Sequence, residues 1–161
     1  MKIKMGKILE YLLREDVIVV FDVDGVLAAY EFGELCHNQC TDGEWEDFVK
    51  QNRPYDRAKA IPQIKKFIKD KGVKNVYTCS VSAPFEEENK KNFIIREYNI
   101  SEENIIFVRD SKDKLLFLRE LAKKGNPEEK IALVEDTVST LNSIFDQSDF
   151  ITVHVSSFFF Y

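Results

Sequence analysis

Two aspartates separated by one residue, Asp22 and Asp24, directly follow an apolar run and precede Gly25. Side chains two residues apart in an extended chain point to the same side, so we expect both carboxylates to face one crevice. Carboxylates this close repel one another unless a proton or a cation lies between them. Their oxygen atoms suit a hard cation such as Mg²⁺. On its own, the pair is equally compatible with two aspartates that only cap a strand.

Hydroxyl side chains stand at the end of the second apolar run. Ser80 is the first candidate there, because a hydroxyl can donate a hydrogen bond to an anion. Thr78 and Ser82 lie on the same face of an extended chain and are alternatives to Ser80.

A lysine begins the helical pattern that follows the third apolar run. Lys114 lies four and seven residues before Leu118 and Leu121, so it shares their inward-facing stripe at the start of the helix. The helix dipole disfavours a cation at this end unless an anion offsets its charge. Lys112, two residues earlier, is the alternative.

A second acidic pair, Glu135 and Asp136, follows the fourth apolar run. If the ends of these runs meet, four carboxylates, a hydroxyl and a lysine converge on one crevice. Such a set suits a divalent cation together with a phosphoryl group.

Alternating elements must bring these residues together. Short apolar runs rich in β-branched residues alternate with helical patterns, and the runs cover residues 17–21, 76–79, 105–108, 131–134 and 151–155. This alternation predicts the α/β class: a three-layer, Rossmann-like sandwich with a mainly parallel five-stranded sheet. In such sheets the ligand crevice lies at the carboxyl ends of the strands, where the candidate residues stand.

One segment interrupts the alternation. Residues 30–57 separate the first run from the first crossover helix and contain a short possible helix with Trp45, Phe48 and Val49. A connection this long at the crevice end predicts a functional loop, so we expect a small cap or lid inserted in a single domain that spans residues 1–161.

These motifs, in this order, resemble the haloacid dehalogenase (HAD) superfamily, most members of which are phosphatases with an aspartate nucleophile. The first motif, residues 22–26, matches well, and Ser80, Lys114 and Glu135–Asp136 stand where the second, third and fourth motifs are expected. The match extends from residue 17 to about residue 155 and suggests a small-cap or capless phosphatase-like member.

The resemblance implies an aspartyl-phosphate mechanism. Asp22 would attack phosphorus, and Asp24 would protonate the leaving oxygen and then activate water. Mg²⁺ would be held by the Asp22 carboxylate, the main-chain carbonyl of Asp24 and Asp136, with Glu135 near the metal or assisting. Hence the activity expected is that of a Mg²⁺-dependent hydrolase acting on phosphomonoesters.

The remaining motif residues, Ser80 and Lys114, would bind the phosphoryl oxygens. A small insert leaves the crevice open to phosphorylated protein or nucleic-acid ends, or closes over a small phosphomonoester such as a nucleotide. We expect a small-molecule substrate, with a homodimer as one way to complete the pocket.

The fourth motif departs from the usual pattern and leaves alternatives open. Glu135 replaces an aspartate, and Thr140 and Leu141 stand where many relatives have another acid. A phosphate-binding or regulatory module with little turnover is therefore the second hypothesis. A receiver-like signalling domain, with Asp110 after the third run as its phosphorylated residue, is the third.

Composition limits the classes of protein. The 161 residues carry 23 basic and 28 acidic side chains, a net charge of −5, which argues against bulk binding of nucleic acid. No apolar run approaches the roughly 18 residues of a membrane span, and the N-terminus lacks the features of a secretory signal. Three cysteines form no disulfide framework, so we expect a cytoplasmic protein that does not bind membranes.

Other conspicuous residues receive structural interpretations. Cys36, His37 and Cys40 are too few for a zinc site, and His154 is interpreted as a satisfied core residue. The acidic run of residues 86–88 is interpreted as the solvated start of a helix. The aromatic C-terminus, residues 158–161, is expected to pack on the domain edge or to form a dimer contact.

Overall fold

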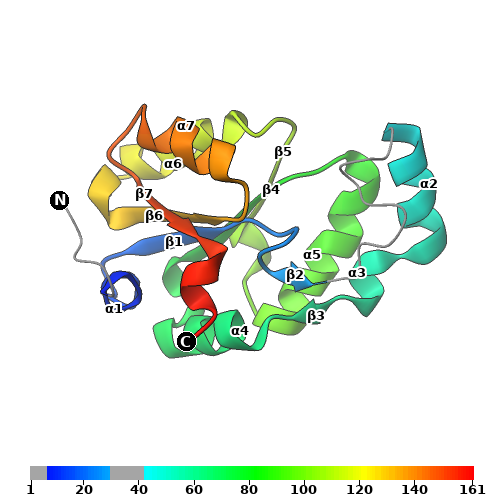
Figure 1. The fold of residues 1–161 in the computed structure, drawn as a ribbon, viewed down its shortest axis with the longest axis horizontal. Helices are drawn as coiled ribbons and strands as arrows, with labels where there is room; N and C mark the ends of the chain where they lie inside the picture. The colour runs from blue at the N-terminus through cyan, green and yellow to red at the C-terminus, as the bar shows by residue number, and fades with distance from the viewer. Residues whose placement is uncertain (1–6, 30–41) are drawn as a thin grey trace.

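The computed structural model describes residues 7–29 and 42–161. Its centre is a parallel five-stranded sheet in the order β5-β4-β1-β6-β7 (Figure 1). The strands are β1 (Ile18–Phe21), β4 (Val76–Val81), β5 (Ile105–Val108), β6 (Ile131–Glu135) and β7 (Ile151–His154). Each of the five predicted runs is therefore a strand of one sheet.

Helices cover both faces of this sheet. On one face lie α6 (Asp113–Lys123) and α7 (Val138–Phe145), and on the other lie α1 (Ile8–Leu12), α4 (Pro62–Lys71) and α5 (Pro84–Tyr98) (Figure 1). The predicted three-layer, Rossmann-like α/β sandwich is confirmed.

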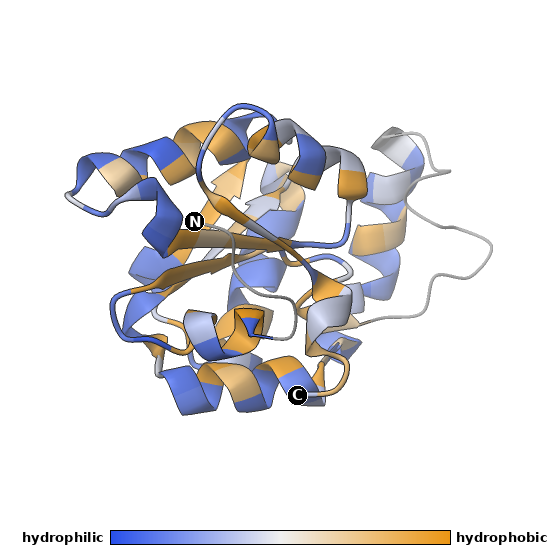
Figure 2. Ribbon diagram, turned by 60° about the vertical axis from the view of Figure 1, so that its left-hand side comes forward, coloured by the Kyte–Doolittle hydropathy of each residue, from blue (hydrophilic) through white to orange (hydrophobic). Residues whose placement is uncertain are grey.

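The central strand shows why an uninterrupted apolar run was needed. Val19 and Phe21 pack toward α4 and α5, whereas Ile18 and Val20 pack toward α6 and α7, and all four are buried. When both faces of a strand are covered, its side chains on both faces are apolar, so its sequence does not alternate between apolar and polar residues. In Figure 2 the strands are mostly hydrophobic, whereas the outer helices alternate hydrophobic and hydrophilic residues.

Short 3₁₀ turns adjoin the strands. Three of them lead directly into β4, β5 and β6: η1 (Val73–Asn75), η2 (Glu102–Asn104) and η3 (Glu128–Lys130). A fourth, η4 (Val155–Phe158), follows β7 and places the Phe158 ring edge-on to Phe67 of α4, at 5.0 Å between centroids. Tyr161 packs on Phe67 as well, whereas Phe160 is fully exposed, so the aromatic terminus packs on the domain edge only in part.

The region after β1 contains the helix predicted there and a strand pair that was not predicted. It comprises β2 (Ala28–Ala29), α2 (Asp42–Asn52), α3 (Pro54–Arg57) and β3 (Lys59–Ala60), in which β2 and β3 pair antiparallel. Two-residue strands of alanine and lysine carry no period-2 signal. Residues 30–41 lie outside the described part, so the cap boundaries at 30–57 remain a prediction.

Helix α5 anchors the region from β2 to β3, which we call the insert, to the five-stranded sheet and its helices, which we call the body. The Tyr98 hydroxyl donates to the Leu27 carbonyl at 2.6 Å and accepts from the Ile61 amide at 3.0 Å. Arg96 donates to the carbonyl of Tyr55 in α3 at 3.2 Å. The segments on either side of the insert are thus held by one helix.

Strand order reverses between β1 and β6, which lie side by side at the centre of the sheet. Such a switch point opens a crevice at the carboxyl ends of the two strands, because their connections leave in opposite directions. Among the described residues, no helix is long and apolar enough to cross a membrane.

Candidate active site

The chain turns sharply at the end of β1. The Asp22 amide donates to the Val134 carbonyl at 2.9 Å, which extends the β1–β6 pairing by one residue. Gly25 then adopts φ +75°, and a Cβ at this position would lie 2.4 Å from Oδ2 of Asp136. Glycine is required here for its backbone conformation and for the close approach of that carboxylate.

Lys114 lies buried between two acids. Its Nζ is 3.0 Å from Oδ1 of Asp22 and 2.5 Å from Oε2 of Glu135, and the lysine is 3% exposed. Burial alone would lower the pKa of Lys114, but the two carboxylates raise it above its usual value. The anion that a lysine at this helix start requires is therefore supplied by Asp22 and Glu135.

Glu135 is held from both sides. Its Oε1 accepts from the amides of Asp136 at 3.0 Å and Thr137 at 3.2 Å, while Oε2 faces Lys114. Burial would raise the pKa of Glu135, but Lys114 and these donors hold it below its usual value. Glu135 is thus an ionised partner that fixes Lys114.

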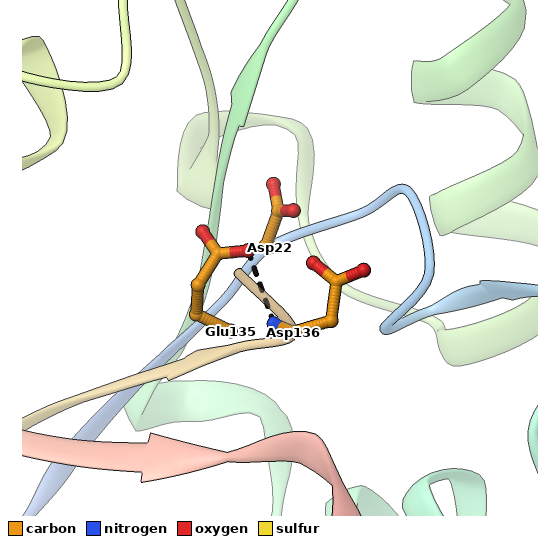
Figure 3. Close-up of side chains that lie close together, drawn as sticks. All are labelled: Asp22, Glu135 and Asp136. Atoms are coloured by element: carbon orange, nitrogen blue, oxygen red, sulfur yellow. Dashed lines mark hydrogen bonds between the residues drawn. The ribbon is translucent and has the colours of Figure 1, made fainter. Parts of the chain in front are cut away.

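The acids at the switch point are grouped closely enough to hold a cation. One oxygen from each of Asp22, Glu135 and Asp136 lies within 4.8 Å of the others, and Figure 3 shows the three side chains converging from β1 and β6. Burial raises the pKa of Asp22 to about 7, and burial together with Glu135 raises that of Asp136 to about 6. Three carboxylates lie beside a single lysine here, and a hard divalent ion with oxygen ligands would offset the remaining negative charge. The donor set therefore fits Mg²⁺. We call Asp22, Lys114, Glu135 and Asp136 the Lys114 cluster.

The alternative lysine lies away from these acids. Lys112 is exposed, and its Nζ is 3.6 Å from Asp110. Asp110 also accepts from the Lys112 amide at 3.0 Å and thus forms a local turn contact. Lys114 is therefore the lysine that faces Asp22, and Asp110 is an exposed residue with local turn contacts.

The hydroxyls of β4 differ in their partners. Ser82 Oγ accepts from the Lys90 Nζ at 2.9 Å, whereas Ser80 Oγ has only long contacts, 3.5 Å to Lys90 and 3.4 Å to the Val81 carbonyl. Both serines are buried. Thr78 is buried too, and its Oγ1 has no hydrogen-bond partner in the part of the chain described. Of the two serines, Ser80 has the weaker protein contacts, and its role as a phosphate ligand remains a prediction.

A second buried lysine, not predicted from the sequence, holds Asp24. The Lys90 Nζ lies 2.7 Å from Oδ2 of Asp24 and 3.4 Å from Glu86, and the Tyr55 hydroxyl donates to Oδ1 of Asp24 at 2.7 Å. Trp45 of α2 donates from Nε1 to Glu86 at 3.0 Å. We call Asp24, Lys90, Glu86, Tyr55 and Trp45 the Lys90 cluster.

The interpretation of residues 86–88 as a solvated face is wrong for Glu86, which is buried. Its Oε2 accepts from the Ala83 amide at 2.8 Å, as in a capping contact, while Oε1 faces the insert. A signal was available in the sequence. Glu86 and Lys90 are four residues apart, and Lys90 lies three and four residues before Phe93 and Ile94 on the buried face of α5.

His154 is not a core residue, because it ends β7 and is only partly buried. Its Nδ1 lies 2.8 Å from Ser156 Oγ, and its Nε2 lies 3.2 Å from the main-chain carbonyl of Asp136. The candidate zinc ligands Cys36, His37 and Cys40 lie outside the described residues.

The sequence matches no protein-family model and no curated protein. Among solved structures, the chain is similar to the HAD domain of the effector protein Lem4 from Legionella pneumophila, with 18% identity and a TM-score of 0.47. That similarity covers 86% of this chain and 84% of the other. At this level it concerns the overall fold, and the chemistry of the site follows from its own residues.

Proposed function

We propose that the protein is a Mg²⁺-dependent phosphomonoester hydrolase with Asp22 as its nucleophile. The observation that carries this proposal is the Lys114 cluster: a buried carboxylate beside a buried lysine, with two further acids, at the switch point of a parallel sheet. This arrangement places a nucleophile, a cation for phosphoryl oxygens and candidate metal ligands together.

The reaction proceeds in two displacements. A carboxylate oxygen of Asp22 bonds to phosphorus as the ester P–O bond breaks, and the leaving oxygen takes a proton from Asp24, which has to be in its protonated form at this step. Asp24 then removes a proton from water, whose oxygen attacks phosphorus and releases inorganic phosphate and the Asp22 carboxylate. Two aspartates can divide these roles because their surroundings differ, with Asp22 beside Lys114 and Asp24 beside Lys90.

The other residues of the site stabilise charge on the phosphoryl group. The Lys114 ammonium and the Ser80 hydroxyl donate to its oxygens, while Glu135 fixes Lys114. When bound, Mg²⁺ offsets the repulsion between the Asp22 carboxylate and the phosphate dianion. The Asp22 carboxylate, the Asp24 main-chain carbonyl and Asp136 would hold it, with Glu135 near the metal or assisting.

The substrate class we propose is a small phosphomonoester, such as a nucleotide, in preference to a macromolecular phosphate. The insert offers aromatic side chains near the site: the Trp45 and Phe48 rings stack on each other at 5.5 Å, and Trp45 is linked through Glu86 to Lys90. An aromatic surface of this kind favours a planar leaving group.

Hydrolysis of 4-nitrophenyl phosphate with and without Mg²⁺ tests the activity. Asp22→Asn keeps the shape of the side chain but removes its nucleophilic charge, so we expect kcat to fall by several orders of magnitude, roughly 10⁴-fold or more. Asp110→Asn, which changes an exposed aspartate after β5 in the same way, is the matched control, and we expect it to retain activity. Undiminished activity of the Asp22 variant would rule out the proposed nucleophile.

The second candidate is a phosphate-binding module with little turnover. It is favoured by the ion pair between Lys90 and Asp24, because this pair stabilises the ionised carboxylate and not the protonated form that a general acid needs. Calorimetric binding of Mg²⁺ and phosphate without turnover on a panel of nucleotides, sugar phosphates and phosphopeptides would support it. Turnover of any of these substrates supports the hydrolase instead.

A further inference from the structure

Lys90 is a buried hub between the body and the insert. It is 1% exposed, and its ammonium donates to the Val81 carbonyl at 3.2 Å as well as to Ser82 and Asp24. It also lies 5.4 Å from the centre of the Tyr55 ring. An ammonium with three protons is fully used by these acceptors. Lys90 is therefore fixed in place and cannot reach out toward a phosphoryl group without losing these bonds.

Asp24 is held between this hub and the insert. Lys90 engages Oδ2 and the Tyr55 hydroxyl engages Oδ1, each at 2.7 Å. The carboxyl plane is consequently fixed by contacts from α5 on one side and α3 on the other. A general acid requires such positioning, because proton transfer depends on the distance to the leaving oxygen.

Glu86 extends these contacts to α2. Its Oε1 accepts from Trp45 Nε1 at 3.0 Å and lies 3.4 Å from both the Tyr55 hydroxyl and the Lys90 ammonium. Glu86 is 5% exposed, so these bonds form away from water, where they are strong. A continuous path of contacts therefore runs from Trp45 through Glu86 to Lys90 and Asp24.

We propose that the Lys90 cluster is a positioning device that couples the insert to Asp24, so that contacts made by α2 and α3 determine how well Asp24 delivers its proton. Lys90, Glu86, Tyr55 and Trp45 are positioning residues that act through Asp24. The inference rests on the proposed function, since it concerns the proton that the leaving oxygen takes when the P–O bond breaks.

The leaving group distinguishes positioning from a merely structural role. 4-Nitrophenolate leaves readily without a proton, whereas phenolate needs one, so loss of Asp24 positioning slows phenyl phosphate more than 4-nitrophenyl phosphate. Destabilisation of the fold lowers the active fraction and reduces both rates by the same factor. The ratio of kcat/KM for the two substrates is therefore the quantity to measure.

We expect Lys90→Met and Tyr55→Phe to change this ratio by about tenfold, and Trp45→Phe, two contacts further away, by about threefold. Lys91→Met is the control on the same helix, because Lys91 pairs only with the exposed acids Glu88 and Glu102 in the contacts described. We expect this variant to leave the ratio unchanged. Tyr55→Phe loses a single oxygen and keeps the test available if the buried Lys90 variant does not fold.

An Asp24→Asn background provides the decisive comparison. Tyr55→Phe should add no further change to the ratio there, because the group it positions is already inactive. An equal loss for both substrates in every cluster variant, or a change in ratio that persists in the Asp24→Asn background, overturns the coupling. Absence of any hydrolysis by the wild type refutes the proposed function instead, so the two failures are distinguishable.

Discussion

Two buried lysines at the same edge of the sheet each lie between two carboxylates, yet their surroundings differ. In the Lys114 cluster the carboxylates belong to Asp22 and Glu135, and Asp136 adds a third acid within reach. In the Lys90 cluster they belong to Asp24 and Glu86, and neutral donors from Tyr55 and Trp45 complete the set. The Lys114 cluster has three carboxylates for one ammonium, whereas the Lys90 cluster has two and is closed by aromatic side chains.

The difference follows from the elements that supply the residues. The Lys114 cluster is built from β1, β6 and the start of α6, all of which pack in the body. The Lys90 cluster joins α5 to α2 and α3 of the insert. Carboxylates fixed at a rigid sheet edge can keep a net negative charge that binds a cation. Contacts with the insert, by contrast, can make the position of Asp24 depend on the position of the insert.

The largest effect expected separates the two lysines. Lys114→Met removes the cation that faces Asp22, so kcat/KM for 4-nitrophenyl phosphate should fall on the order of 10²–10³-fold. Lys90→Met should lower it less than about tenfold, since this substrate needs little help from Asp24. Steady-state kinetics with circular dichroism to verify folding provide the measurement. Equal losses would mean that the two clusters do not have different roles.

Two glycine substitutions separate an effect on the candidate metal site from an effect of backbone strain. In Gly25→Ala the new Cβ would meet Asp136 Oδ2 at 2.4 Å, so the apparent affinity for Mg²⁺ should fall by about 10–100-fold. Gly72→Ala is matched, because Gly72 has φ +82° but no atom within 4 Å of the added Cβ. Both variants should lose about 1–2 kcal/mol of stability. Calorimetric titration with Mg²⁺ tests the contrast, which fails if Gly72→Ala weakens binding equally.

The fold could be predicted because the strands carry strong local signals. The runs that became β1, β4 and β6 are almost entirely buried, and the edge strands β5 and β7 are half-buried; parallel strands covered in this way appear in the sequence as continuous apolar segments. The pair β2–β3 escaped prediction because two residues per strand show no periodicity. Its pairing follows from tertiary packing against α5.

The candidate site could be predicted where residue chemistry and chain order coincide. Asp22, Lys114, Glu135 and Asp136 each stand at an element end, and the parallel topology brings those ends to one edge. Lys90 and Glu86 lie within the first turns of α5 and look like an ordinary i, i+4 surface pair. Their burial depends on Tyr55 and Trp45 of an insert whose docking no local pattern encodes.

The pH dependence of Mg²⁺ binding sharpens the description of the Lys114 cluster. The pKa of Asp22 is raised to about 7 and that of Asp136 to about 6, so both carboxyls carry protons below pH 6 that the metal must displace. Affinity should therefore rise on the order of tenfold from pH 6 to pH 8 and level off above the pKa of Asp22. Asp136→Asn should bind more weakly with a shallower pH dependence. A wild-type affinity that is constant over this range contradicts the raised pKa values.

The smallest effects separate the two serines of β4. Ser80→Ala should lower kcat/KM on the order of tenfold for 4-nitrophenyl and phenyl phosphate alike, because a hydrogen bond to the phosphoryl group is lost whatever the leaving group. Ser82→Ala removes only an acceptor of Lys90, so it should shift the ratio between the two substrates by about twofold and leave 4-nitrophenyl phosphate nearly unaffected. The two hydroxyls share one strand face, and each then belongs to a different cluster: Ser80 acts with Lys114 on the phosphoryl group and Ser82 with Lys90 on Asp24. If Ser82→Ala instead slows both substrates equally and Ser80→Ala has no effect, the phosphate ligand is Ser82.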